Sequence, residues 1–273
     1  MIFGFSLSEF MVLLGLGLIG AAAILPYSFA LAGDKVSQAR LSRPVLALIS
    51  FVQTAVLMAL ATGLGLTAAG PVGLGAPYIQ AVMAGGQLPA SILKPVLPAA
   101  GLALLSFLLM ELLERSVFSP HVPQALRRSD AGMPLWKRLL ASLYGGFDEE
   151  LLMRLFLVSG LVWIGGRFWQ DTGGMPARGA YWTAILLAAL LFGLGHLPAT
   201  RTLTPLTPML ITRAVVLNGI AGIAFGWLYW QYGLEAAMLS HFCADILLHV
   251  LGPFFVHQIY GSAEHLEPGP GPK

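Results

Sequence analysis

Charged residues are scarce in this sequence. Asp, Glu, Lys and Arg make up 10% of the 273 residues, whereas soluble domains carry about 25%. Hydrophobic residues make up 57%, and the mean hydropathy is +0.78. This composition is typical of a membrane protein with little room for a soluble domain. The net charge of +2 is too small to suggest nucleic acid, so we expect the lipid bilayer as a partner and no nucleic acid.

The sequence also has little cysteine and no typical signal-peptide pattern at its start. Cys243 is the single cysteine, so an internal disulfide is excluded and the redox compartment stays open. The first 32 residues lack a basic leading segment and are too long and too apolar for a cleavable signal peptide. We therefore interpret them as the first membrane-spanning helix.

Long apolar runs are what the sequence has in abundance. A spanning helix needs about 20 mostly apolar residues, and polar breaks divide the chain into seven such runs. The runs are 7–32, 45–69, 94–114, 140–165, 180–197, 209–231 and 234–256. The segment 71–93, rich in Gly, Pro and Ala, is a loop, an interfacial helix or a weak eighth span. We expect an all-α polytopic membrane bundle of seven or eight transmembrane helices.

The same pattern suggests a division of the chain. We expect N-terminal transmembrane helices and connecting loops in 1–139, a bundle that carries the candidate site in 140–258, and a disordered tail in 259–273. There is no internal repeat and no separate soluble domain.

Lys and Arg are unevenly distributed between the two ends of these helices. One side holds eleven of the 15, and the opposite side holds only Lys94, Arg167 and Arg178. The eleven are Lys35, Arg40, Arg43, Arg115, Arg127, Arg128, Lys137, Arg138, Arg201, Arg213 and Lys273. Because cytoplasmic loops carry the excess of Lys and Arg, the sequence predicts an N-terminus outside and a C-terminus in the cytoplasm.

The fourth run contains a charged stretch, "GGFDEELLMRLFL", from Gly145 to Leu157. Glu150 and Arg154 are four apart and can pair on one helix face. Glu149 points about 100° away, so it stays free of that pair. An alternative is that the acids only cap the start of the helix at the membrane surface, where negative charge suits the helix dipole.

Two later runs also carry ionisable groups. His196 closes the fifth run, one turn after Phe192, and His241 and Asp245 share a face of the seventh, extended by His249. Ionisable residues within spans are rare and usually face the bundle interior. An interfacial histidine and a purely structural His–Asp hydrogen bond remain alternatives. Counting along the helices puts Glu149 about 9–15 Å from its end, with His241 nearer the opposite face.

These residue types suit hydrolysis. A glutamate assisted by histidine can take a proton from water, and imidazole or carboxyl groups can stabilise an oxyanion. The same groups are also good zinc ligands, and sequence spacing does not separate the two cases. The H-E-x-x-H and G-x-S-x-G motifs are missing. Cys243 lies two residues from His241, on nearly the opposite face, and we interpret it as a small buried residue.

Three ordered motifs resemble those of the CPBP family, which comprises type II CAAX prenyl endopeptidases and bacteriocin-processing or immunity-type membrane proteins. The motifs are Glu149-Glu150-x-x-x-Arg154, Phe192-x-x-x-His196 and His241-x-x-x-Asp245. The resemblance covers about 100 residues of this chain, from Glu149 to Asp245. The family's last motif ends in Asn or Asp, so Asp245 fits it. The resemblance implies an intramembrane endopeptidase that acts on a membrane-associated protein or peptide.

The resemblance also implies roles for single residues. Glu149 would activate water with help from His196, and His241 and Asp245 would hold the oxyanion. An ionised Asp245 would instead orient His241. Glu150, Arg154 and Phe192 would support the site. The family has been described both as metalloprotease and as glutamic-type protease. We favour the glutamic type, with no cofactor, and keep zinc as the alternative.

Two other classes of function stay open. Intramembrane charges also mark the ion paths of transporters, although no inverted repeat is evident. A family member without catalysis would serve as a binding or immunity protein. A cleavage assay separates these alternatives from a protease.

Overall fold

The computed structural model describes residues 5–33, 36, 38–86 and 90–252. Within these ranges every regular element is helical, apart from an isolated bridge between Gln170 and Pro176. The expected disordered tail at 259–273 lies outside the described residues, as do Lys35 and the last residues of the seventh predicted run.

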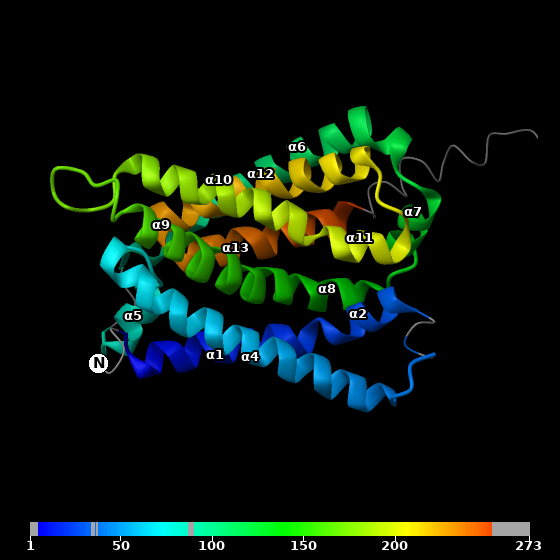
Figure 1. Cartoon of the computed structure of the whole chain (residues 1–273), viewed down its shortest axis with the longest axis horizontal. Coiled ribbons are helices and arrows are strands. Elements are labelled where there is room, and N and C mark those ends of the chain that lie inside the picture. Colours follow the sequence, from blue (N-terminus) through cyan, green and yellow to red (C-terminus); the bar gives the residue numbers. More distant parts are fainter. Residues whose placement is uncertain (1–4, 34–35, 37, 87–89, 253–273) are drawn as a thin grey trace, which may run out of the picture.

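The main helices lie side by side along the long axis of the molecule (Figure 1). They are α1 (Leu7–Ala23), α2 (Leu25–Ala32), α4 (Arg43–Ala69), α6 (Val96–Leu113), α8 (Leu135–Tyr144), α9 (Ser159–Gly165), α10 (Arg178–Gly195), α12 (Pro208–Tyr232) and α13 (Leu234–Asp245). Shorter helices connect or flank them: α5 (Pro77–Met83), α7 (Gln124–Ala131) and α11 (Leu197–Leu203). The bundle therefore has the expected all-helical class.

Six helical runs among the described residues are long and apolar enough to cross a membrane. They are Leu7–Ala32, Arg43–Val72, Ser91–His121, Arg178–Leu203, Pro208–Tyr232 and Leu234–Leu251, and they correspond to six of the seven predicted runs. The remaining predicted run, 140–165, lies in an unbroken helical stretch from Leu135 to Gly165. It differs from the other six in its larger number of charged residues. In Figure 1 it nevertheless runs beside them, from α8 to α9.

The segment 71–93, for which a loop, an interfacial helix and an eighth span were all predicted as alternatives, contains only short helices in its described part. Its described part holds α5, seven residues long, and single turns on either side. At about 1.5 Å per residue, α5 is about 10 Å long, which is far short of the 30 Å hydrocarbon core. The described part of this segment does not span a membrane.

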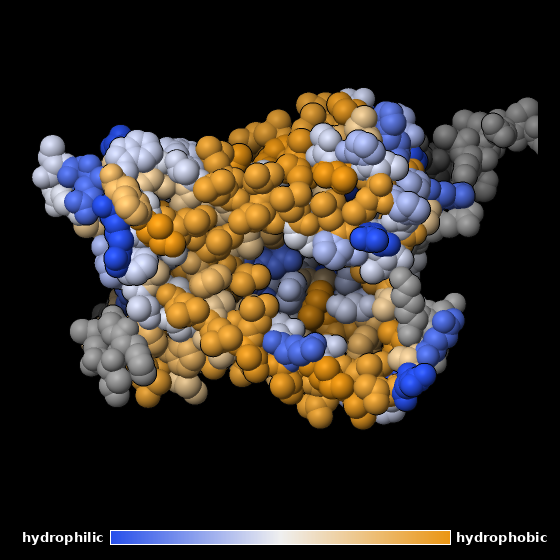
Figure 2. All heavy atoms as spheres, viewed as in Figure 1, coloured by the Kyte–Doolittle hydropathy of each residue, from blue (hydrophilic) through white to orange (hydrophobic). Residues whose placement is uncertain are grey.

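The outer surface supports an integral multi-pass membrane protein. Figure 2 shows apolar side chains across the middle of one face and hydrophilic residues gathered at its two ends. Large exposed apolar residues occur on several helices, among them Leu48, Leu60, Leu97, Leu108 and Leu186. Such a surface suits lipid rather than water. The orientation of the two ends stays a prediction from the positive charges.

The first predicted span is bent. Helix α1 ends at Ala23, and α2 begins at Leu25 with Pro26 in its first turn. Proline has no N–H to donate and its ring disturbs the preceding turn, which accounts for a break at Ile24. Helix α2 has no fully buried residue, and it covers one side of the candidate site described next.

Candidate active site

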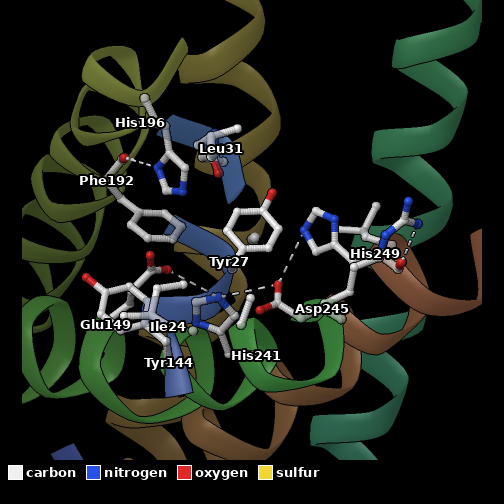
Figure 3. Close-up of a pocket in the computed structure, with 18 of the residues that line it drawn as sticks. Ile24, Tyr27, Leu31, Tyr144, Glu149, Phe192, His196, His241, Asp245 and His249 are labelled. Atoms are coloured by element: carbon white, nitrogen blue, oxygen red, sulfur yellow. Dashed lines mark hydrogen bonds and ion pairs between the residues drawn. The ribbon is translucent and has the colours of Figure 1, made fainter. Parts of the chain in front are cut away.

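A cavity of about 740 Å³ gathers the four predicted catalytic residues. Glu149, His196, His241 and Asp245 all line it, although they come from three separate stretches of the chain. Figure 3 shows their side chains directed into this space, with Phe192 between the two histidines. Its walls are formed by α2, α4, α6, α8, α10, α11, α12 and α13, together with the turn at 145–149.

The helix that carries the acids is locally irregular. Between α8 and α9 it makes two π-helical stretches, Gly145–Glu149 and Leu151–Val158. Such wide turns occur frequently at functional sites. Gly145 lets α13 approach closely, because a methyl group there would overlap Oδ2 of Asp245 and lie 3.1 Å from Nε2 of His241. A role for Gly145 was not predicted from the sequence, where the pair Gly145-Gly146 was the available signal.

The predicted pairing of Glu150 and Arg154 is confirmed. Nη1 of Arg154 lies 2.9 Å from Oε1 of Glu150, and both side chains are buried. Nη2 of Arg154 donates to the carbonyl oxygen of Gly222 at 3.2 Å. The guanidinium also lies near the rings of Phe192 and Phe225, at 5.2 and 5.4 Å from their centroids. The positive charge of Arg154 thus neutralises one of the acids inside the bundle.

His241 links this pair to the cavity. Its Nδ1 lies 2.7 Å from the Oε1 of Glu150 that Arg154 also contacts. Because a carboxylate can only accept, Nδ1 carries a proton and donates it to Glu150. The ring stacks on Phe225 with centroids 4.7 Å apart, so both its orientation and its tautomer are fixed. Sequence spacing gave no indication of this contact between helices.

The other nitrogen of His241 faces two further acids. Its Nε2 lies 3.5 Å from Oε2 of Glu149 and 3.7 Å from Oδ1 of Asp245. These separations are too long for good direct hydrogen bonds. The side chains of His241 and Glu149 both line the cavity, so an oxygen atom of a molecule that enters it can approach Nε2 and Oε2 together. The side chain of Glu149 is 22% exposed. It is therefore accessible from the cavity and lies beside His241, although the sequence predicted only that it stays free of the Glu150–Arg154 pair.

His196 approaches the same space from α10. Its Nδ1 lies 2.8 Å from the carbonyl oxygen of Phe192. A carbonyl only accepts, so Nδ1 must donate, and the neutral ring offers Nε2 as an acceptor. Figure 3 shows that nitrogen directed toward the middle of the cavity. The ring of Phe192 meets both histidines edge-on, at 4.8 Å from His196 and 5.9 Å from His241.

Asp245 lies between two imidazoles at the end of α13. Its Oδ1 is 3.7 Å from Nε2 of His241 and 4.0 Å from Nε2 of His249. His249 is half exposed, and its carbonyl oxygen accepts a hydrogen bond from Arg138 at 3.0 Å. Asp245 faces Nε2 of His241 rather than Nδ1, so Glu150 is the acid that sets the tautomer of His241.

Glu149 lies farther along its helix than counting from the predicted start of that helix suggested. The helix that carries Glu149 begins at Leu135, five residues before its predicted start, so Glu149 lies about 21 Å along it. His241 lies about 10 Å along α13, which enters from the opposite end. Because the two helices run in opposite directions, a residue far along one lies level with a residue near the start of the other, and this brings Glu149 and His241 together.

If zinc were bound instead, we would expect Glu149, His196 and His241 as its ligands. Among the described residues, no group of three or more His, Cys, Asp or Glu side chains is arranged to hold a metal ion. Each histidine already uses Nδ1, on Glu150 and on the Phe192 carbonyl, so only Nε2 would be offered.

Comparison with known proteins agrees with the motifs. Residues 131–247 match the family model of the Rce1-like type II CAAX prenyl endopeptidases. This region contains all seven residues of the three motifs and ends just beyond Asp245. Comparisons with curated proteins and with solved structures gave no match.

Proposed function

Since its Rce1-like domain at 131–247 assigns the chain to the CPBP family, we propose that it hydrolyses a peptide bond with water activated by Glu149. The family supports an intramembrane CAAX-type endopeptidase in general terms. The observation that carries the mechanism is that Oε2 of Glu149 lies 3.5 Å from Nε2 of His241 on the wall of the cavity. Glu150, in contrast, is occupied by Arg154 and His241.

In the proposed first step, Glu149 takes a proton from water while the water oxygen bonds to the carbonyl carbon of the peptide. The carbonyl oxygen becomes an oxyanion in a tetrahedral intermediate. Nε2 of His196 accepts a hydrogen bond from the same water and helps orient it. In the second step the carbon–nitrogen bond breaks, and Glu149 returns its proton to the leaving amine.

His241 and Asp245 would stabilise the oxyanion. Nδ1 of His241 is committed to Glu150, so Nε2 donates to an oxyanion when the ring carries both protons. Asp245 donates only as the neutral acid. Because Glu150 already fixes the orientation of His241, we favour Asp245 as a donor over its alternative role as an orienting carboxylate.

The substrate we propose is a membrane-associated protein or peptide in an extended conformation. The cavity is lined by apolar residues of α2, including Leu25, Phe29 and Leu31, as well as by the ionisable groups. Figure 2 shows a hollow with hydrophilic residues inside it on the otherwise apolar face. This arrangement suits a chain that reaches the site from the lipid.

The test is cleavage by the purified protein in liposomes. The probe is an internally quenched peptide ending in a farnesylated CAAX sequence, and the same peptide without the lipid is run in parallel. We expect fluorescence release by the wild type and two peptide fragments by mass spectrometry. A transporter or a non-catalytic binding protein would leave both peptides intact.

A further inference from the structure

Asp148 is the first acid of the charged stretch and has no place in the proposed mechanism. It precedes Glu149 in the same π-helical turn but does not line the cavity. Its side chain is fully buried, and neither carboxyl oxygen has a hydrogen-bond partner among the described residues. Buried polar groups are normally hydrogen-bonded, so this carboxyl calls for a reason beyond filling space.

The carboxyl of Asp148 sits in a notch in α1. A methyl group added at Gly20 would overlap Oδ2 of Asp148, and it would lie 2.8 Å from Cγ. It would also lie 3.3 Å from Cα of Tyr144. The missing side chain at Gly20 is therefore what gives this carboxyl its space, and α1 touches the turn that carries the acids at this point.

Three successive acids thus point in three directions. Asp148 enters the notch in α1, Glu149 faces the cavity, and Glu150 meets Arg154 and His241. Because all three belong to one short stretch of helix, a rotation of the backbone that moves one side chain moves the others. The contact between Asp148 and α1 therefore affects the direction in which the side chain of Glu149 points.

We propose that Asp148 is a positioning residue whose seat in the Gly20 notch fixes the rotation of the 145–149 turn and so directs Glu149 into the cavity. The proposal rests on the proposed function only for the role of Glu149. An ionised carboxylate with no partner is costly in the interior, so we expect the neutral isostere Asn to serve equally well.

The first experiment measures kcat and KM with the farnesylated quenched peptide. D148N should stay within about 3-fold of the wild type, whereas D148L should lose about 100-fold in kcat with KM little changed, as for a small misplacement of a catalytic group. Wild-type kcat in D148L, or equal losses in D148L and D148N, overturns the proposal. If D148L does not elute as a single peak from a sizing column, the glycine variants below decide.

The second experiment changes the other side of the contact. G20A should lower kcat about as much as D148L, because its methyl group displaces the carboxyl. G15A is the matched control on the same helix, since nothing lies within 4 Å of a methyl group at Gly15. In the double variant G20A/D148A the loss should not exceed that of D148A alone. Multiplied losses, or equal effects of G20A and G15A, contradict the proposal.

The third experiment needs no cleavage. In a C243A background, E149C provides a single thiol at the position that faces the cavity. A small water-soluble methanethiosulfonate should label this thiol at equal rates alone, with G15A and with D148N, and about 10-fold more slowly with D148L or G20A. Equal rates in all five proteins would overturn the positioning role. If the wild type cleaves no peptide but these rates differ as expected, only the proposed function fails.

Discussion

Two buried polar clusters lie toward opposite ends of this bundle, and they satisfy their acids differently. At the end where α5 lies, Oε1 of Glu235 accepts the backbone N–H groups of Tyr78 and Ile79 at 2.9 and 2.8 Å. Glu9 accepts from the side-chain amide of Gln80 at 2.8 Å. In the cavity, by contrast, Glu149 and Asp245 lie 3.5 and 3.7 Å from Nε2 of His241, distances too long for good hydrogen bonds.

This difference indicates that the acids near α5 have a structural role, whereas the acids of the cavity have a chemical one. The acids near α5 hold neutral donors on α5 itself, so they tie it to α1 and α13. The second carboxyl oxygen of Glu235 has no hydrogen-bond partner among the described residues, but it is buried away from the cavity. The cavity acids keep accepting atoms free beside groups that exchange protons. Each prediction below tests whether this contrast holds, starting with the largest expected effect.

The sharpest comparison exchanges one glutamate for glutamine in each cluster. E149Q should lower kcat at least about 1,000-fold, since the amide cannot take a proton from water. E235Q should cleave at the wild-type rate, because its amide oxygen can still accept from the two N–H groups of α5. Both are measured with the quenched peptide after checking that each protein inserts and elutes as a single peak. Near wild-type turnover by E149Q would end its assignment as the base.

The next largest effect is expected for His241. H241A removes the group that faces both Glu149 and Asp245, and losing one oxyanion donor typically costs about 100- to 1,000-fold in rate. We expect the loss in kcat rather than in KM, because the interaction forms in the transition state. A change confined to KM would instead make His241 a binding residue.

A smaller effect is expected for D245N. If Asp245 acts as a neutral donor, Asn replaces it with an N–H, and activity should stay within about 10-fold with a flatter dependence on pH. Cleavage is compared from about pH 5.5 to about 8.5, the range in which histidine commonly titrates. A uniform loss of more than about 100-fold would assign Asp245 the orienting role instead.

The cluster near α5 should respond in stability alone. E235A removes the acceptor for two N–H groups at the start of α5, and loss of a helix cap typically costs about 1 kcal/mol. We expect a lower midpoint of thermal unfolding in detergent, with kcat unchanged. A fall in kcat without a change in the midpoint would remove the distinction between the clusters.

Chelation should have no effect at all. For a glutamic-type enzyme, prolonged treatment with a strong chelator leaves cleavage unchanged, and the purified protein contains far less than one zinc per chain. Metal analysis and activity are measured on the same samples. Stoichiometric metal whose removal and return switch cleavage off and on would replace the proposed mechanism, with Glu149, His196 and His241 as the first ligands to test.

Sequence reasoning succeeded where contacts are local. The spacing of four residues was enough to predict that Glu150 pairs with Arg154, because geometry within one helix turn depends little on the rest of the fold. Apolar runs likewise gave six helices that the structure contains. The break near Pro26 could also have been suspected from the proline itself.

Contacts between different helices could not be predicted from the sequence. The bond from His241 to Glu150 depends on the register of α13 against the acid-bearing helix, which packing sets. The π-helical turns and the notch at Gly20 follow from the same packing. The early start of that helix at Leu135 was missed because Lys137 and Arg138 interrupt the apolar pattern there.

Helix α2 has a consequence for chemical inhibitors. It supplies five residues of the cavity wall, Leu25, Tyr27, Ser28, Phe29 and Leu31, yet it lies outside the region that matches the family model. A compound that contacts only Glu149 and the histidines engages groups that belong to the shared motifs. A compound extended onto α2 would also contact residues outside the region that matches the family model, so α2 is where selectivity among related proteins should be sought.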